Sequence, residues 1–148
     1  MGSTPSEDLA LRAWRAVLRG HNRVLRGLDA ELTEHYGLSY RAFDVLIRLS
    51  RSAGGAMRMS ELATAVMLTP SGTTRLVDQL VERSLVLRKA DSKDARVQLA
   101  VLTPEGRALL RKAYQGYTRA VRRLFADRFS EEQLLVFAEA FEELVGSS

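Results

Sequence analysis

The stretch that decides the fold runs from Thr69 to Pro104 and reads TPSGTTRLVDQLVERSLVLRKADSKDARVQLAVLTP. Thr69 and Pro70 begin a helix, because a threonine side chain can cap free amides and proline fits the first helical position. The apolar face of this helix repeats at helical spacing and consists of Thr73, Leu76, Val77 and Leu80. The stretch therefore predicts a helix that is buried along one face.

The opposite face of this helix is polar. It carries small hydroxyls, one arginine and one amide, which are Ser71, Thr74, Arg75 and Gln79. The acidic residues Asp78 and Glu82 come only further along. Because its first turns lack acids, such a helix can enter DNA by its N-terminal end, with Arg75 contacting a base edge or a phosphate. The alternative is that Arg75 pairs with Asp78 or Glu82 on its own helix.

A β-hairpin follows this helix. Val97, Leu99 and Val101 alternate with Arg96 and Gln98, which is the period of two that a half-buried strand shows. We therefore expect the three apolar residues to share the buried side of the strand. The hairpin tip, DSKDAR, is too polar and too charged to belong to a core.

The hairpin and the residues after it resemble a known family, the MarR-type winged helix-turn-helix regulators. Asp94-Ala95-Arg96, followed by the strand and by LTPEG at 102–106, is similar to the family's D-x-R wing and L-T-x-x-G motif. The preceding SGTTRLVDQLVERSLVLR resembles the family's recognition helix and first wing strand. Ser84 departs from the pattern, because the family commonly has glycine at this helix end. The resemblance covers nearly the whole chain.

The resemblance implies a sequence-specific regulator that binds double-stranded DNA as a homodimer. The expected fold is mainly α-helical with a small β-hairpin wing, in a single domain over residues 1–148. Within it, 39–102 form the winged helix-turn-helix lobe, and 7–36 and 103–148 form the dimerisation helices. The expected DNA contacts are Pro70, Ser71, Thr73, Thr74, Arg75, Gln79, Lys93, Asp94 and Arg96.

The wing contacts have a physical rationale of their own. Lys93 and Arg96 suit a minor groove, whose negative potential favours basic side chains. Asp94 has the wrong charge for DNA, and the family pattern implies that it orients Arg96. A solvated hairpin tip with no DNA contact is the alternative.

The operator is expected to be palindromic, and the regulator is expected to be a repressor.

A small-molecule effector is a further expectation. Many members of the family are released from DNA by small aromatic or phenolic anions held between the dimer helices and the DNA-binding lobe. Carried over to this chain, that implies a ligand site formed by Trp14, Arg15, His21, Tyr36 and Arg41. Two alternatives stay open. One is a DNA-binding regulator without a ligand, and the other is a helical small-molecule-binding or enzymatic protein that does not touch DNA.

Long helices are expected at both ends of the chain. The first covers residues 7–36, and the last covers 131–145 after a capping box of Ser130 and Gln133. Their apolar faces are wider than a helix needs for its own core, so we expect a second subunit to cover one side. The other expected elements are a stop at Gly37, a helix at 40–51 capped by Ser39, a strand at 57–59, a helix at 61–66 capped by Ser60, and a helix from Thr103 to Phe125.

Composition limits the classes of protein to which the chain can belong. The chain has 148 residues, 46% of them hydrophobic and 27% charged, which is ordinary for one globular domain. It has no cysteine, which excludes disulfides and thiol-based redox sensors. Its net charge of +4 suits a nucleic-acid partner and equally a mildly basic enzyme. We expect no membrane span or secretory signal, and hence a cytoplasmic location.

No enzymatic chemistry is expected. His21 and His35 are the only histidines. They lie about 21 Å apart along one helix and cannot share a metal within one chain. No glycine-rich phosphate loop or nucleophile elbow is present. We therefore expect no catalytic residues, no metal and no cofactor.

Overall fold

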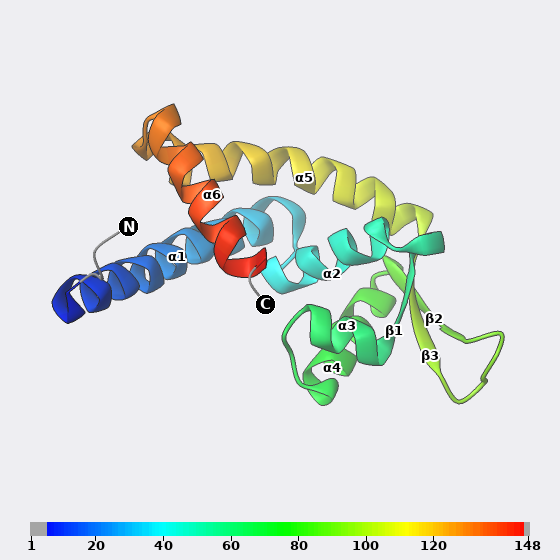
Figure 1. Cartoon of the computed structure of the whole chain (residues 1–148). Coiled ribbons are helices and arrows are strands. Elements are labelled where there is room, and N and C mark those ends of the chain that lie inside the picture. Colours follow the sequence, from blue (N-terminus) through cyan, green and yellow to red (C-terminus); the bar gives the residue numbers. More distant parts are fainter. Residues whose placement is uncertain (1–5, 147–148) are drawn as a thin grey trace. The chain divides into compact units, whose positions relative to one another are not determined.

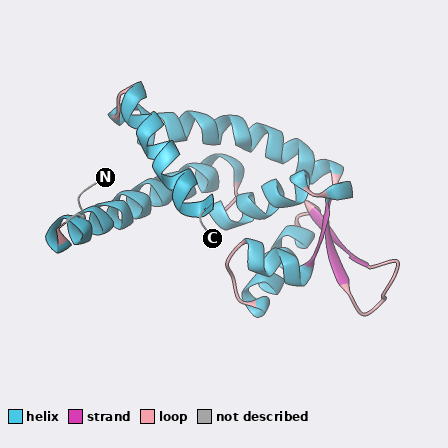
Figure 2. Cartoon of the chain, viewed as in Figure 1, coloured by secondary structure: helices cyan, strands magenta, loops and turns pink. Residues whose placement is uncertain are grey.

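The computed structural model describes residues 6–146 (Figure 1). Its secondary structure consists of helices and one small antiparallel sheet, as Figure 2 shows. The expected fold class, mainly α-helical with a β-hairpin wing, is confirmed.

The chain divides into two compact units. The central unit is Asp29–Tyr117, and the terminal unit is Met1–Leu28 together with Thr118–Ser148. Two long helices, α1 (Glu7–Tyr36) and α5 (Pro104–Leu124), contribute residues to both units. Each unit is described by itself below.

The central unit has a short sheet and several helices. The strands pair antiparallel in the order β1-β3-β2, and we call the β2–β3 hairpin (86–102) the wing. The strand expected at 57–59 lies one residue earlier and pairs with β3. Helix α3 begins before the expected Glu61, with Arg58 instead of Ser60 at its N-cap. The elements between the two long helices are α2 (Tyr40–Arg51), η1 (Ala53–Gly55), β1 (Ala56–Arg58), α3 (Met59–Ala65), α4 (Pro70–Glu82), β2 (Val86–Ala90) and β3 (Gln98–Leu102).

Local end signals explain the helix boundaries. Gly37 has a φ of 62°, in the left-handed region that glycine adopts without strain, and α1 ends directly before it. The Ser39 hydroxyl accepts the Ala42 N–H at 3.1 Å and caps α2. In the same way the Thr69 hydroxyl accepts the Gly72 N–H at 3.0 Å and caps α4. All three signals were expected from the sequence and are confirmed.

The expected buried face of the central strand is wrong. Ala100 is 0% exposed and Leu102 is 7% exposed, whereas Leu99 and Val101 on the other face of β3 are only partly buried. The run Leu99-Ala100-Val101-Leu102 is apolar in both phases, so alternation alone does not decide which face is inside. Ala100 is small enough to lie directly under the helices, and it belongs to the buried core.

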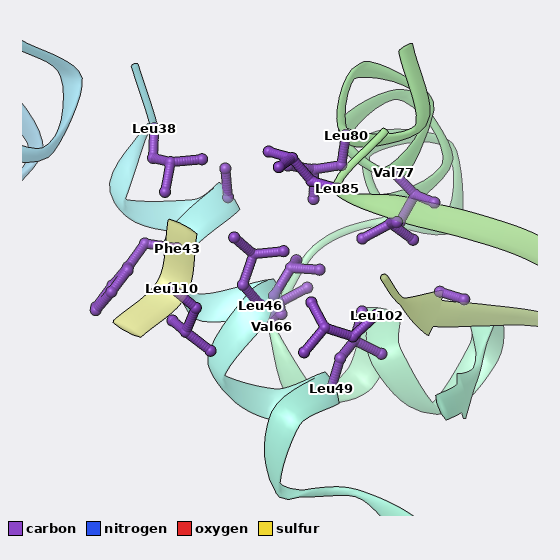
Figure 3. Packing of buried hydrophobic residues seen from close by; sticks show 14 of the residues in the cluster. Leu38, Phe43, Leu46, Leu49, Val66, Val77, Leu80, Leu85, Leu102 and Leu110 are labelled. Atoms are coloured by element: carbon purple, nitrogen blue, oxygen red, sulfur yellow. The ribbon is translucent and has the colours of Figure 1, made fainter. Parts of the chain in front are cut away.

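The core of the central unit joins its helices to its sheet. Figure 3 shows Phe43 and Leu46 of α2 gathered with apolar side chains of α4, the wing and α5. Full burial of each such side chain contributes roughly 1.5–3 kcal/mol. The cluster comprises Leu32, Leu38, Ala42, Phe43, Val45, Leu46, Leu49, Leu62, Val66, Val77, Leu80, Leu85, Val86, Ala100, Leu102, Leu110 and Ala113.

The L-T-x-x-G motif forms a hydrogen-bonded junction where the wing meets α5. The Thr103 N–H donates to the Leu85 carbonyl at 3.1 Å, and the Thr103 hydroxyl donates to the Ser84 carbonyl at 2.7 Å. The same hydroxyl accepts the Gly106 N–H at 2.9 Å. A Cβ added at Gly106 would overlap the Leu85 carbonyl oxygen. The motif therefore requires glycine because backbone meets backbone here.

Ser84 occupies the position where the family commonly has glycine. Its φ is 59°, which is left-handed and strained for any residue with a Cβ. Its N–H donates to Val81 O at 2.9 Å, and the next N–H, of Leu85, donates to Leu80 O at 3.0 Å. The helix end therefore has the glycine-type geometry although the residue is serine.

The terminal unit leaves much of its apolar surface open. It contains η2 (Ala126–Arg128) and α6 (Glu131–Gly146), and the expected capping box of Ser130 and Gln133 is confirmed by reciprocal hydrogen bonds of 2.9 and 3.3 Å. No described residue of α6 is buried. Among the described residues, no helix is both long and apolar enough to cross a membrane. The exposed large apolar residues of this unit are Leu9, Leu11, Trp14, Leu18, Leu135, Val136, Phe137, Phe141, Leu144 and Val145.

Candidate nucleic-acid interface

Helices α3 and α4 are joined by a tight turn and form a helix-turn-helix unit. The Val66 N–H donates to Leu62 O at 2.9 Å as α3 ends. Met67 follows with a φ of 55° and a side chain that is 87% exposed. A left-handed residue changes the chain direction within a few positions, so the second helix, α4, can begin at Pro70.

The N-terminal end of α4 is open and uncharged. Pro70 and Ser71 are exposed, and the first turn contains no acidic residue. The Thr69 hydroxyl lies 3.3 Å from the Ser71 hydroxyl while it caps the Gly72 N–H. The free amides and the positive end of the helix dipole favour a phosphate at such an end.

The polar face of α4 is exposed beyond this end as well. Thr74, Arg75 and Gln79 all face solvent. Within residues 6–146, the Arg75 side chain makes no hydrogen bond or ion pair, so the expected alternative of pairing with Asp78 or Glu82 is not what the structure shows. The Arg75 guanidinium is free to contact a base edge or a phosphate.

Thr73 does not belong to this surface. Its side chain is 1% exposed, and its hydroxyl donates to the Thr69 carbonyl at 3.0 Å. The expectation that the Thr73 side chain contacts DNA is therefore wrong. The same residue was also assigned to the apolar face of the helix, and that assignment is confirmed.

Arg88 is a residue of this surface that sequence reasoning missed. It lies on β2, and its Nη2 donates to the Asp78 carboxylate at 2.8 Å and to the Thr74 carbonyl at 3.3 Å. The contact joins the wing to α4 and neutralises the acid beside the polar face. The sequence shows both charges, but the pairing depends on how β2 packs against α4, which no local pattern reports.

The wing tip is ordered by its own aspartates. Asp94 Oδ1 accepts the Arg96 N–H at 3.0 Å and the Arg96 Nε–H at 3.3 Å. Asp91 accepts the Lys93 N–H at 2.8 Å and lies 3.5 Å from Arg58 Nη2. The Arg96 side chain is still 93% exposed, so Asp94 holds its Nε while the rest of the guanidinium faces solvent.

The five expected ligand contacts are not gathered in one unit. Trp14, Arg15 and His21 belong to the terminal unit, whereas Tyr36 and Arg41 belong to the central unit. Trp14 is 58% exposed. Arg41 Nη1 donates to the Val66 carbonyl at 3.4 Å, at the end of α3. The ligand site remains a prediction.

The central unit also contains an aromatic cluster that the sequence analysis did not single out. Phe43 lies 5.0 Å from Tyr117 between ring centroids, and Tyr117 lies 5.9 Å from Tyr114. Tyr40 and Tyr117 lie close enough for each hydroxyl to influence the pKa of the other. Burial raises the pKa of both hydroxyls above the usual 10.0, and the Asp44 charge raises the pKa of Tyr40 further. Both hydroxyls are therefore neutral at physiological pH.

Comparison with known proteins identifies a family and solved structures to which this chain is similar. Residues 38–97 match the model of the MarR family. The chain is similar to AbsC, a MarR family transcriptional regulator from Streptomyces coelicolor, with 30% identity and a TM-score of 0.84 over 98% of this chain and 97% of AbsC. It is similar to Sco3205 from the same organism, which was solved in complex with DNA, with 27% identity and a TM-score of 0.84 over 99% of this chain and 91% of Sco3205.

A curated relative gives a similar result. The HTH-type transcriptional repressor MdtR of Bacillus subtilis (strain 168) is 29% identical over 105 residues. The match covers 71% of this chain and 66% of MdtR.

Proposed function

Because the chain belongs to the MarR family of DNA-binding transcriptional regulators, we propose that it is a homodimeric repressor that binds a palindromic operator in the cytoplasm. Membership of this family makes the chain a regulator and not an enzyme. A repressing role is supported by its similarity to MdtR, whose name describes a repressor. The observation that carries the proposal is the exposed polar face of α4, on which Arg75 pairs with no other residue of the described part of the chain.

The N-terminal half of α4 is the proposed reader of the major groove. Ser71, Thr74, Arg75 and Gln79 share its exposed polar face, and Pro70 lies at its open end. An arginine at this place can donate two hydrogen bonds to guanine, which is the commonest specific contact with a base. The free amides beside Ser71 suit a backbone phosphate.

The wing is the proposed reader of the adjacent minor groove. Arg96 projects from its tip, where its Nε donates to Asp94, and Lys93 is exposed beside it. A narrow minor groove concentrates negative potential, which favours an arginine inserted there. Residues 39–102 would then act as one DNA-binding lobe, in which Arg88 fixes the wing to α4.

Dimerisation is supported by the terminal unit. Its helices expose Leu, Val, Phe and Trp side chains over a length that a soluble monomer would not leave open. A second copy would cover this surface, so we assign the exposed apolar residues within 7–36 and 103–148 to the dimer interface. A two-fold dimer presents α4 twice, and the half-site centres should lie about 10 base pairs apart.

The test of the α4 assignment is binding of the wild type and Arg75→Ala to an operator library at two salt concentrations. If Arg75 reads a guanine, the substitution should cost about 1–3 kcal/mol per half-site and relax preference at one symmetric position. If it contacts only phosphate, affinity should fall about equally for all sequences, with a smaller salt slope. Arg111→Ala is the matched control, because Arg111 is an exposed arginine of α5 outside this surface. A footprint without two-fold symmetry, or unchanged affinity and preference in Arg75→Ala, would remove α4 from this role.

Arg96→Ala tests the wing in the same library. Affinity should fall most on operators with a narrow A·T-rich groove beneath the wing, because the arginine contributes most where the negative potential is greatest. The dimer and the thermal unfolding midpoint should be unchanged, since the Arg96 side chain is 93% exposed. Equal affinity of Arg96→Ala and the wild type on every operator would remove Arg96 from the interface.

A small aromatic anion is the proposed effector, with Trp14, Arg15, His21, Tyr36 and Arg41 as its contacts. Trp14 is the only tryptophan, so its fluorescence reports binding near it directly. Titration with salicylate should quench Trp14 and release the operator over the same concentration range. Release can follow only if the anion binds the DNA-free conformation more tightly. Operator binding that is unaffected at saturating anion would favour the ligand-independent regulator.

A further inference from the structure

Arg83 joins the end of α4 to the end of α1. It is the C-cap residue of α4, and its guanidinium reaches back across 46 residues of sequence to Gly37. Nη1 donates to the Gly37 carbonyl, and Nη2 donates to the Tyr36 carbonyl at 3.3 Å. All three residues belong to the central unit. None of these contacts is part of the proposed DNA surface.

The carbonyls that Arg83 binds are the free acceptors of a helix C-terminus. Helix α1 ends at Tyr36, and left-handed Gly37 turns the chain so that the Gly37 N–H donates to Thr33 O and the Leu38 N–H to Leu32 O. The carbonyls of Tyr36 and Gly37 are left outside the helical ladder, at the negative end of the helix dipole. A guanidinium satisfies both at once and adds a favourable charge interaction.

This contact is directional, unlike the apolar packing of α4. Val77 and Leu80 bury the middle of α4 in the core. Apolar contacts resist separation but not small rotations, because the hydrophobic effect has no preferred direction. Two hydrogen bonds from one planar guanidinium to fixed main-chain oxygens do have one.

From this geometry we infer that Arg83 is a positioning residue that fixes the C-terminal end of α4 to the C-terminal end of α1 within the central unit, and so narrows the range of half-site spacings that the regulator accepts. The inference rests on the proposed DNA-binding homodimer. In that dimer, α1 would be shared with the second copy through its exposed apolar residues, such as Leu11 and Leu18. An α4 that is held firmly within each central unit would then tolerate fewer spacings than an α4 that can rotate there.

The test compares operators whose two half-sites are identical and whose spacer differs in steps of one base pair. Full-length wild type, Arg83→Ala and Arg83→Lys are titrated against each operator, with Arg111→Ala as the control for loss of an exposed arginine. The wild type should prefer one spacing. Arg83→Ala should lower the ratio of best to next-best affinity by about three- to tenfold, which is the range for charge-assisted hydrogen bonds discounted for solvent exposure. Arg83→Lys should restore little, because an ammonium cannot hold both carbonyls in one plane.

A second readout does not depend on DNA. Amide hydrogen exchange of Gly37 and Leu38 reports the end of α1 directly, and it should be faster in Arg83→Ala than in the wild type or in Arg111→Ala. Unchanged exchange in Arg83→Ala would show that the contact does not hold the helix end, and would overturn the inference.

The outcomes separate the inference from the proposed function. An equal loss of affinity at all spacings would make Arg83 a stabilising cap and overturn its positioning role, while the DNA-binding dimer would stand. If the affinity of the wild type did not depend on the presence of two half-sites, the proposed binding of DNA as a dimer would be refuted, and this inference with it. A flattened spacing profile in Arg83→Ala together with faster exchange would support both.

Discussion

The central unit is closed around its own core, whereas the terminal unit is open. Residues 29–117 bury a continuous cluster from Leu32 to Ala113. In the terminal unit, Leu28 and Ala120 are the buried residues among those described, and α6 buries none. Both units contain helices with ordinary caps, so the difference lies in whether the apolar faces are buried within the same chain.

The difference teaches that stability and assembly are separate properties of this chain. A core as large as that of the central unit stabilises the fold at any protein concentration. In the proposed dimer a second copy covers the open apolar surface of the terminal unit, so the contribution of this surface to stability should depend on protein concentration. Substitutions in the two units should therefore produce different kinds of loss.

The largest effect is expected from Phe141→Asp in α6. Phe141 is exposed in one chain, and we expect a second copy to bury it, so the substitution would place a carboxylate in each half of the interface. The dimer dissociation constant should rise roughly a thousandfold, which corresponds to about 4 kcal/mol for two sites. Analytical ultracentrifugation measures this, with Glu142→Gln as the neighbouring control. An unchanged dimer dissociation constant would contradict the proposal that the terminal unit, unlike the central unit, serves assembly.

Gly106→Ala should give the largest loss within the central unit. A Cβ at this position would overlap the Leu85 carbonyl oxygen, so the wing and α5 would have to separate. Overpacking of this kind costs about 3 kcal/mol of unfolding free energy. Chemical denaturation should show the same loss at low and high protein concentration. A loss that disappears at high concentration would mean that the central unit also depends on its partner.

Ser84→Gly should have a smaller effect of the opposite sign. Serine at a φ of 59° is strained, and glycine adopts this conformation freely. The substitution should raise the unfolding free energy by about 0.5–1 kcal/mol after the entropy of the unfolded glycine is subtracted. Thermal unfolding monitored by circular dichroism would detect this. Destabilisation would show that the Ser84 side chain has a role that its backbone does not explain.

The smallest expected effect is a loss of stability at alkaline pH. Burial, followed by nearby negative charge, raises the pKa of Tyr40 and Tyr117 above 10.0, so the folded chain holds these protons more tightly than the unfolded chain. Their contribution is complete below pH 10 and is lost as the pH rises through the folded pKa. Denaturation between pH 8 and 11 should show a shallower decline for Tyr40→Phe than for the wild type. Parallel curves would mean that Tyr40 does not titrate differently on folding.

The features that sequence predicted well are local. Caps and stops such as Thr69, Ser39 and Gly37 act within four residues, so their side-chain and backbone chemistry can be read directly from the chain. The exposed position of Arg75 also followed from helical periodicity. The fold class followed from these elements and from the resemblance to a family.

The features that sequence missed are set by packing between elements. The buried phase of β3 was wrong because Ala100 is inconspicuous beside Leu99 and Val101, although it fits under the helices. The hydrogen bonds of Arg83 and Arg88 join segments that lie 46 and 10 residues apart, and no periodic pattern reports them. The assigned DNA contacts are still predictions for the same reason, because they depend on a second molecule.

The junction at Thr103 has a consequence for how the wing can vary. It ties Ser84 and Leu85 to Thr103 at the base of the hairpin, so α5 begins from a fixed point whatever the loop beyond β2 and β3 contains. Closing a longer loop costs only about 0.6 kcal/mol for each doubling of its length. Insertions or deletions near Ser92 should therefore be tolerated by the fold. The length of the wing can thus diverge between descendants of this gene without disturbing the flanking helices α4 and α5.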